Sequence, residues 1–122
     1  MTKDEAIQTF WSGYELNAYD ELSLPDNVTL PYITYSVVTD AFENVVSLLG
    51  SLWYHSNSWE AICDKKDEIS EDIGMGGKLL PIDGGYLWIT RGSPFAQRMQ
   101  DPSDDKVKRM YINCQAEFLS AD

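Results

Sequence analysis

The chain has 122 residues, a hydrophobic content of 43% and a formal net charge of −11, which suits one packed soluble domain and excludes a disordered chain. Its apolar runs are too short to cross a membrane as a helix, and the charged start MTKDEAIQTF lacks the apolar core of a signal peptide, so we expect a cytoplasmic protein. No Lys or Arg lies between Asp4 and Asp64 and the last third is balanced in charge, which excludes a basic footprint for sequence-specific nucleic-acid binding.

The first 30 residues predict a helix and a loop. Thr2 and Glu5 have the spacing of a capping box, in which each side chain caps the backbone amide of the other residue. Pro25 and Pro31 exclude a regular ladder from the segment LSLPDNVTLP, which we expect to be a loop. Before it, apolar residues at helical spacing predict a helix over about residues 3–19: Ile7, Phe10, Trp11, Tyr14 and Ala18.

Two strands and a second helix follow. YITYSVVTD (32–40) is rich in β-branched and aromatic residues, and the segment 44–55 continues this composition, so both predict strands. Asn57 and Glu60 form a second capping-box spacing, after which apolar residues recur at helical spacing. We expect this helix to end at Gly74, because glycine readily adopts the left-handed conformation that closes helices.

The glycine-rich stretch GMGGKLLPIDGG (74–85) suggests nucleotide binding, but its spacing excludes this interpretation. A phosphate-binding P-loop needs a glycine where Asp72 stands and a Ser or Thr where Leu79 stands. The dinucleotide-binding pattern needs a third glycine, and Leu79 also occupies that position. We expect the glycines to form turns, including a hairpin turn at 83–85 between the strands LLPI and YLWITRG.

The last third predicts a loop and a long strand. We expect SPFAQRMQDPSDD (93–105) to be a loop or a bent segment, because Pro94 excludes an interior strand. Residues 109–118 alternate strictly between polar and apolar, so one side of this strand faces the core and the other faces solvent, a lumen or a neighbour. At the end of the segment 93–105, an acidic cluster lacks the order and the glycine of a calcium-binding loop, and we interpret it as a solvated turn: Asp101, Asp104 and Asp105.

These elements predict an α+β fold in which a largely antiparallel β-sheet packs with two main α-helices. We expect a single domain, residues 1–122, with an N-terminal helix and loop over 1–30 and the α+β core over 31–122.

No set of residues in the sequence assembles an active site, so we expect no enzyme, no metal and no cofactor. His55 is the single histidine, and neither a nucleophile elbow nor zinc-ligand spacing accompanies it. We expect Cys63 and Cys114 to be reduced thiols, and a disulfide between them stays open. A sugar or base platform is one interpretation of three aromatic residues, but a place in the core or in a subunit contact is more common: Trp53, Trp88 and Phe95.

Four segments in series carry a resemblance to a known family: LPYITYSVV, SLWYHSNSW, IGMGGKLLPIDGGYLWITRGSPFAQRM and KRMYINCQAEFLSAD. Together they span roughly residues 30–122 and resemble the tail terminators (tail completion or minor structural proteins) of long-tailed bacteriophages. The resemblance implies a virion protein, assembled in the host cytoplasm, that forms a hexameric ring on the head-proximal end of the tail tube. Such a ring ends tube polymerisation, contacts the tail tube protein and a neck or head completion protein, and lets DNA pass through its lumen without specific binding. The alternative is a small cytoplasmic ligand-binding or toxin–antitoxin-type regulatory module.

Like subunits that close a ring meet through a heterologous interface, in which one edge meets a different edge of the next copy. We place this interface at Arg91, Phe95, Gln97 and Arg98, because aromatic and Arg side chains dominate contact energies. The acidic first half of a neighbouring copy can receive the arginines. In the alternative interpretation, Phe95 packs in the core of its own subunit and the arginines only solubilise the loop.

Overall fold

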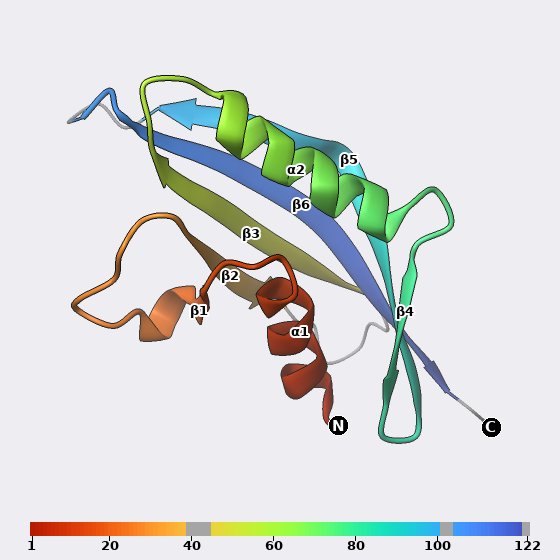
Figure 1. The fold of residues 1–122 in the computed structure, drawn as a ribbon. Coiled ribbons are helices and arrows are strands. Elements are labelled where there is room, and N and C mark those ends of the chain that lie inside the picture. The colour runs from red at the N-terminus through yellow and green to blue at the C-terminus, as the bar shows by residue number, and fades with distance from the viewer. Residues whose placement is uncertain (39–44, 101–103, 121–122) are drawn as a thin grey trace.

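A computed structural model describes residues 1–38, 45–100 and 104–120. The chain in these ranges forms two α-helices, a short 3-10 helix and one curled six-stranded sheet with the strand order β1-β2-β3-β6-β5-β4 (Figure 1). In chain order the elements are α1 Lys3–Ser12, β1 Ala18–Asp20, η1 Glu21–Ser23, β2 Tyr32–Val38, β3 Val45–His55, α2 Glu60–Ile73, β4 Lys78–Ile82, β5 Gly85–Gln100 and β6 Val107–Ser120.

The prediction of a largely antiparallel sheet is wrong, because the sheet is mixed. β1 pairs with β2 in parallel, with Ala18 opposite Ile33, whereas the other neighbouring strands pair antiparallel. Residues 21–31 return the chain to the end of the sheet at which β1 began, and a return of this kind makes the next strand parallel. The sequence predicts no strand before residue 32, since a strand of three residues is too short for alternation to be detected.

Both helices lie on one face of the sheet, and the core fills the space between them and the central strands (Figure 1). On β3 and β6 the core residues lie opposite one another: Leu48 pairs with Cys114 and Leu52 pairs with Met110. The alternation predicted for the last strand is confirmed, because its apolar positions from Met110 to Ala116 are buried. The helices contribute Ala6, Ile7, Phe10, Trp11, Ile62, Ile69 and Ile73 to the same core.

The first helix is shorter than the sequence predicts. The Thr2 capping box forms, with the Thr2 and Glu5 side chains each accepting from the other's backbone amide at 3.2 Å. The helix then ends at Ser12, so Tyr14 lies in a turn and Ala18 in β1, although both side chains are buried. The apolar spacing predicted too long a helix, because the turn and β1 bury Tyr14 and Ala18 on the same side as the apolar residues of α1.

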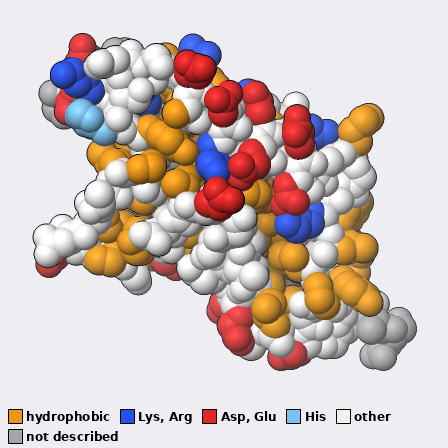
Figure 2. All heavy atoms as spheres, in the orientation of Figure 1, with side chains coloured by type: hydrophobic (Ala, Val, Ile, Leu, Met, Phe, Trp, Pro, Cys, Tyr) orange, Lys and Arg blue, Asp and Glu red, His pale blue; other side chains and the backbone are white. Residues whose placement is uncertain are grey.

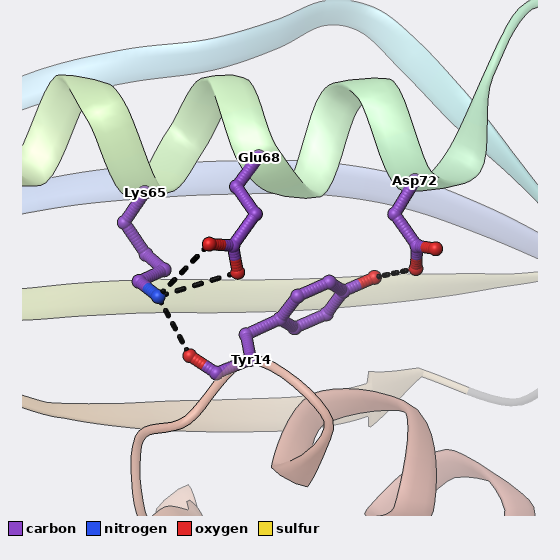
Figure 3. Close-up of polar contacts among 4 residues, drawn as sticks. All are labelled: Tyr14, Lys65, Glu68 and Asp72. Atoms are coloured by element: carbon purple, nitrogen blue, oxygen red, sulfur yellow. Dashed lines mark hydrogen bonds and ion pairs between the residues drawn. The ribbon is translucent and has the colours of Figure 1, made fainter.

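Hydrogen bonds from the turn after α1 hold it against α2 (Figure 3). The Tyr14 hydroxyl donates to Asp72 Oδ2 at 2.8 Å, and Lys65 Nζ donates to the Tyr14 carbonyl at 2.8 Å. Lys78 Nζ donates to the same Asp72 oxygen at 2.5 Å. Burial alone would raise the pKa of the Asp72 carboxyl, but the hydrogen bonds from Lys78 and Tyr14 outweigh it and hold this pKa below its ordinary value. Burial and the Asp72 contact raise the pKa of the Tyr14 hydroxyl, which therefore stays protonated as the donor.

The second helix and the hairpin after it follow the sequence closely. The predicted Asn57 capping box does not form, because α2 begins at Glu60 and its backbone amide donates to Ser58 Oγ at 3.3 Å. The helix ends at Gly74, as predicted, with a φ of 72°. The turn between β4 and β5 contains Gly84 at a φ of 82°, so the predicted hairpin is confirmed.

The segment predicted as a loop or a bent segment over 93–105 continues β5 as far as Gln100, so the loop is wrong for this part, and a β-irregularity marks the place of the bend. Its pairing with β6 is interrupted between Arg91 and Ala96, and Pro94, which has no amide hydrogen to donate, lies in this irregularity. β4 pairs only with residues 85–89 of β5, so among the described residues no strand covers the outer edge of β5 beyond Ile89. Asp104 and Asp105 do form a turn, whereas Asp101 and the predicted strand ends at 39–40 and 44 lie outside the described residues.

Candidate assembly surfaces

The side chains that the sequence offers for chemistry are few, and the described residues bring no metal ligands together. No group of three or more His, Cys, Asp or Glu side chains in these ranges could hold a metal ion. His55 is exposed, and its Nε2 lies 4.0 Å from Asp104 Oδ2. Cys63 and Cys114 are both free thiols, and burial raises the pKa of the Cys114 thiol to about 12. No helix in the described part of the chain is long and apolar enough to span a membrane.

The sheet face opposite the helices, which we call the open face, carries an ordered row of large side chains. Tyr32, Trp53 and Arg109 lie directly opposite one another on β2, β3 and β6. The Tyr32 and Trp53 rings stack with centroids 6.2 Å apart, and Arg109 Cζ lies 4.7 Å from the centroid of the Trp53 ring. Tyr19 extends the row from β1 with an edge contact to Tyr32 at 6.1 Å.

Hydroxyl groups fix the orientation of this row. Trp53 Nε1 donates to Thr34 Oγ1 at 2.8 Å, and Arg109 Nε donates to Ser51 Oγ at 3.0 Å. Thr34 and Ser51 are both buried, although neither α-helix of the described chain covers this face. Beside them a hollow of about 110 Å³ opens, with Glu21 and Tyr111 in its lining. Rigid Trp, Tyr and Arg side chains of this kind dominate the energy of protein interfaces.

The four residues predicted at the subunit interface do not lie on one surface. Gln97 lies opposite Tyr111, whose side chain belongs to the open face. Arg91 Nη1 donates to Ser70 Oγ on α2 at 2.9 Å, and Arg98 lies over the Trp59 ring at 5.1 Å, so both arginines contact the helix side. Phe95 is half-buried and packs against the core of its own chain. The structure therefore brings Arg91 and Arg98 toward α2 and separates Gln97 from them.

An exposed apolar patch lies at the far end of the same sheet, on the β4–β5 hairpin. Leu79 is opposite Trp88, Pro81 is opposite Tyr86, and Tyr86 is in turn opposite Leu119 on β6. Leu79 and Tyr86 expose about half of their surface, 55% and 47%. The sequence reading missed this patch and the Tyr32–Arg109 row, because a residue's cross-strand neighbours appear only once the register is known. The one signal for the Tyr32–Arg109 row in the sequence was the set of polar residues that alternate with the apolar ones over 109–118, because these residues mark the side of the strand that faces away from the core.

Charge is also distributed unequally between the surfaces. Exposed carboxylates form a row along α2, visible as red side chains in Figure 2, which we call the acidic row: Asp64, Asp67, Glu68 and Glu71. Lys65 and Lys66 lie among them and pair with Glu68 and Asp67 at 3.2 and 2.6 Å. Asp64 and Glu71 have no ion pair within the described chain. Two carboxylates on one helix face are thus left for other partners.

Comparison with known proteins identifies one shared fold. No protein-family model matches the chain, and no curated protein matches it. Among solved structures, a chain in the virion of a native gene transfer agent (GTA) particle is similar, with a TM-score of 0.53 and 14% sequence identity. The similarity covers 95% of this chain and 86% of that chain. At this identity the likeness shows a common fold.

Proposed function

We propose that the chain is a structural subunit of a phage-like particle, and that within it the chain acts as a tail terminator. The observation that supports this most is the fold likeness to a chain of a gene transfer agent virion, which extends over nearly the whole chain. The segments that resemble tail terminators point to the same class of particle. In this proposal the chain forms a ring, which we expect to be hexameric, at the head-proximal end of the tail tube. The ring ends tube polymerisation and joins the tail to a neck or head completion protein.

The surfaces of the molecule suit a subunit with many neighbours. The open face, the apolar hairpin patch and the acidic row are three chemically different surfaces on one small chain. A closed ring needs two unlike surfaces for its neighbours and further surfaces for the rings above and below it. An exposed apolar patch beside polar strands is typical of a protein–protein contact. We assign the exposed Arg91 and Arg98 to a subunit contact on the helix side and Gln97 to one on the open face, whereas Phe95 packs against the core of its own chain.

Electron microscopy of particles that carry a labelled copy of the chain tests the proposal. We expect the label at one end of each tail only, and native mass spectrometry of the assembled end to give a ring mass. A label spread along the tube, or absent from particles, would contradict the proposed role.

Changing both Arg91 and Arg98 to Glu should prevent incorporation and leave the thermal unfolding transition nearly unchanged, since both side chains are exposed. Normal incorporation of this variant would place the ring contact elsewhere.

The alternative function, a small ligand-binding or regulatory module, has one observation in its favour. A cavity of about 310 Å³ lies between α1, η1 and β2, with Asp4, Asp20 and Tyr35 in its lining. This volume reaches the lower end of the range for small-molecule sites. A purified protein that stays monomeric and binds a small ligand tightly would support this alternative over the ring.

A further inference from the structure

A basic pocket lies where α2 begins and where β5 ends. The pocket has a volume of about 270 Å³ and is lined by Trp59, Arg98, Met99 and Lys108. Arg98 Cζ lies 5.1 Å, and Lys108 Nζ 5.6 Å, from the centroid of the Trp59 ring. Two cations from neighbouring strands are therefore held beside one aromatic ring at the edge of the molecule.

Neither cation is neutralised within the described chain. The ion pairs there involve other cations: the N-terminal amine, His55, Lys65, Lys66 and Lys78. Arg98 Nη2 donates to Cys63 Sγ at 3.5 Å, and Lys108 Nζ donates to the backbone carbonyl of Asp105, so neither hydrogen bond supplies a negative charge. Two like charges this close to one ring repel each other unless an anion is shared between them. The pocket is thus suited to carboxylate groups, which Arg binds with two parallel hydrogen bonds.

The same molecule carries a surface that complements the pocket. Asp64 and Glu71 are exposed, have no ion pair in the described chain and stand seven residues apart, so both project from one side of α2. A pocket of this size admits acidic side chains but not a whole helix. The pocket and the acidic row are different surfaces, so a contact between them is heterologous and can repeat from copy to copy.

We infer that the basic pocket binds the acidic row of α2 in a second copy of this chain. The inference rests on the proposed function, because it names the surfaces through which neighbouring subunits of the ring meet. Trp59 and Met99 form the wall of the pocket, and Arg98 and Lys108 supply its positive charge. The carboxylates of Asp64 and Glu71 of the second copy bind to these two cations.

Sedimentation equilibrium of the purified chain at concentrations up to the millimolar range, in low and high salt, tests this inference. We expect the wild type to self-associate and high salt to weaken the association, since salt screens exposed charges. Arg98→Glu with Lys108→Glu should weaken it about tenfold or more, because each cation meets a like charge. Asp64→Lys with Glu71→Lys should weaken it to a similar extent. As a control, Lys3→Glu adds negative charge at α1, far from the end of β5 (Figure 1), and should leave association nearly unchanged.

A variant that carries all four changes gives the decisive measurement. It restores opposite charges on the two surfaces, so association should return toward the wild-type value. Failure of this variant to associate better than the two-residue variants would overturn the inference, as would a wild type that stays monomeric. The proposed function is tested separately on particles. If the label lies at tail ends but the charge changes do not alter self-association, the proposed function stands and the proposed contact is wrong. If self-association depends on the pocket but the chain is absent from particles, the proposed contact stands and the proposed function is wrong.

Discussion

At the scale of single residues, the fold depends on a few close contacts that other side chains would not permit. Trp11 is completely buried, and its ring lies against the backbone of Gly50 on β3. A Cβ atom on residue 50 would stand 2.5 Å from Trp11 Cη2 and 2.8 Å from Cζ3. The absence of a side chain at this position is what allows α1 to lie so close to the sheet.

We therefore predict that Gly50→Ala lowers the free energy of unfolding by about 1 to 3 kcal/mol, as overpacked core substitutions do. The Trp11 side chain is completely buried in the core, so any shift of the indole must displace other core side chains. Gly76→Ala is a matched control, because nothing lies within 4 Å of its added Cβ and its φ is ordinary. Urea denaturation followed by tryptophan fluorescence measures both variants. Equal stability of Gly50→Ala and wild type would show that the helix can shift at little cost.

A second residue-scale prediction concerns pH and the Asp72 carboxyl. Its pKa in the folded chain is lower than its ordinary value of 3.8, so the carboxyl adds stability above that pH, and this contribution is lost as pH falls through the folded pKa. The effect is less than about 1 kcal/mol, because 38% of the side chain is exposed and solvent screens the pair with Lys78. The difference in urea midpoint between wild type and Asp72→Asn should shrink on acidification below about pH 4. A difference that is constant with pH would mean that the contacts from Tyr14 and Lys78 do not favour the ionised carboxylate.

At the scale of elements, the hairpin and the long strand after it decide which surfaces the sheet presents. The turn places Leu79 opposite Trp88 and Pro81 opposite Tyr86 on the apolar patch. The pairing of β5 with β6 resumes at Ala96 after the irregularity that follows Arg91. A β-bulge bends its strand and increases the local twist. The curl of the sheet and the place of the basic pocket therefore both depend on β5.

We predict that Gly84→Val destabilises the chain by about 1 kcal/mol or more, because residue 84 has a φ of 82° and a β-branched side chain is strained there. Gly84→Asn should be milder, since asparagine tolerates positive φ better than other residues do. Calorimetric titration with ATP or GTP should show no binding to the wild type. Nucleotide binding that the valine variant abolishes would mean that the glycine-rich stretch is more than a turn.

At the scale of the whole molecule, the net charge of −11 sets what the chain can contact. The acidic row, with the acidic residues of α1 and η1, makes much of the helix side of the molecule negative, whereas Arg98 and Lys108, which have no ion pair in the described chain, lie together near the end of β5. A molecule with such separated charges favours contacts between unlike ends of successive copies. The same negative field opposes the approach of a polyanion.

We predict that the chain does not bind duplex DNA even at low salt, because phosphate affinity requires cations that neutralise the backbone. Fluorescence anisotropy of a labelled duplex at about 50 mM salt should stay unchanged as protein is added. The same titration with the charge-reversed variant Asp64→Lys with Glu71→Lys measures how much positive charge on α2 changes the affinity for DNA. Binding by the wild type that falls steeply with added salt would contradict a lumen through which DNA passes without attachment.

The sequence by itself determined the elements whose signals are local. The Thr2 cap, the end of α2 at Gly74, the Gly84 turn and the alternation along β6 all depend on neighbouring residues, and all four appear in the structure. The tertiary structure decided what depends on contacts between distant segments: the parallel pairing of β1, the exit of Tyr14 from the helix, and the strand that continues past Pro94. The candidate surfaces belong to this second group. Trp59, Arg98 and Lys108 meet because the start of α2 packs beside the ends of two strands, and a one-residue slip of either strand would turn its cation to the opposite face.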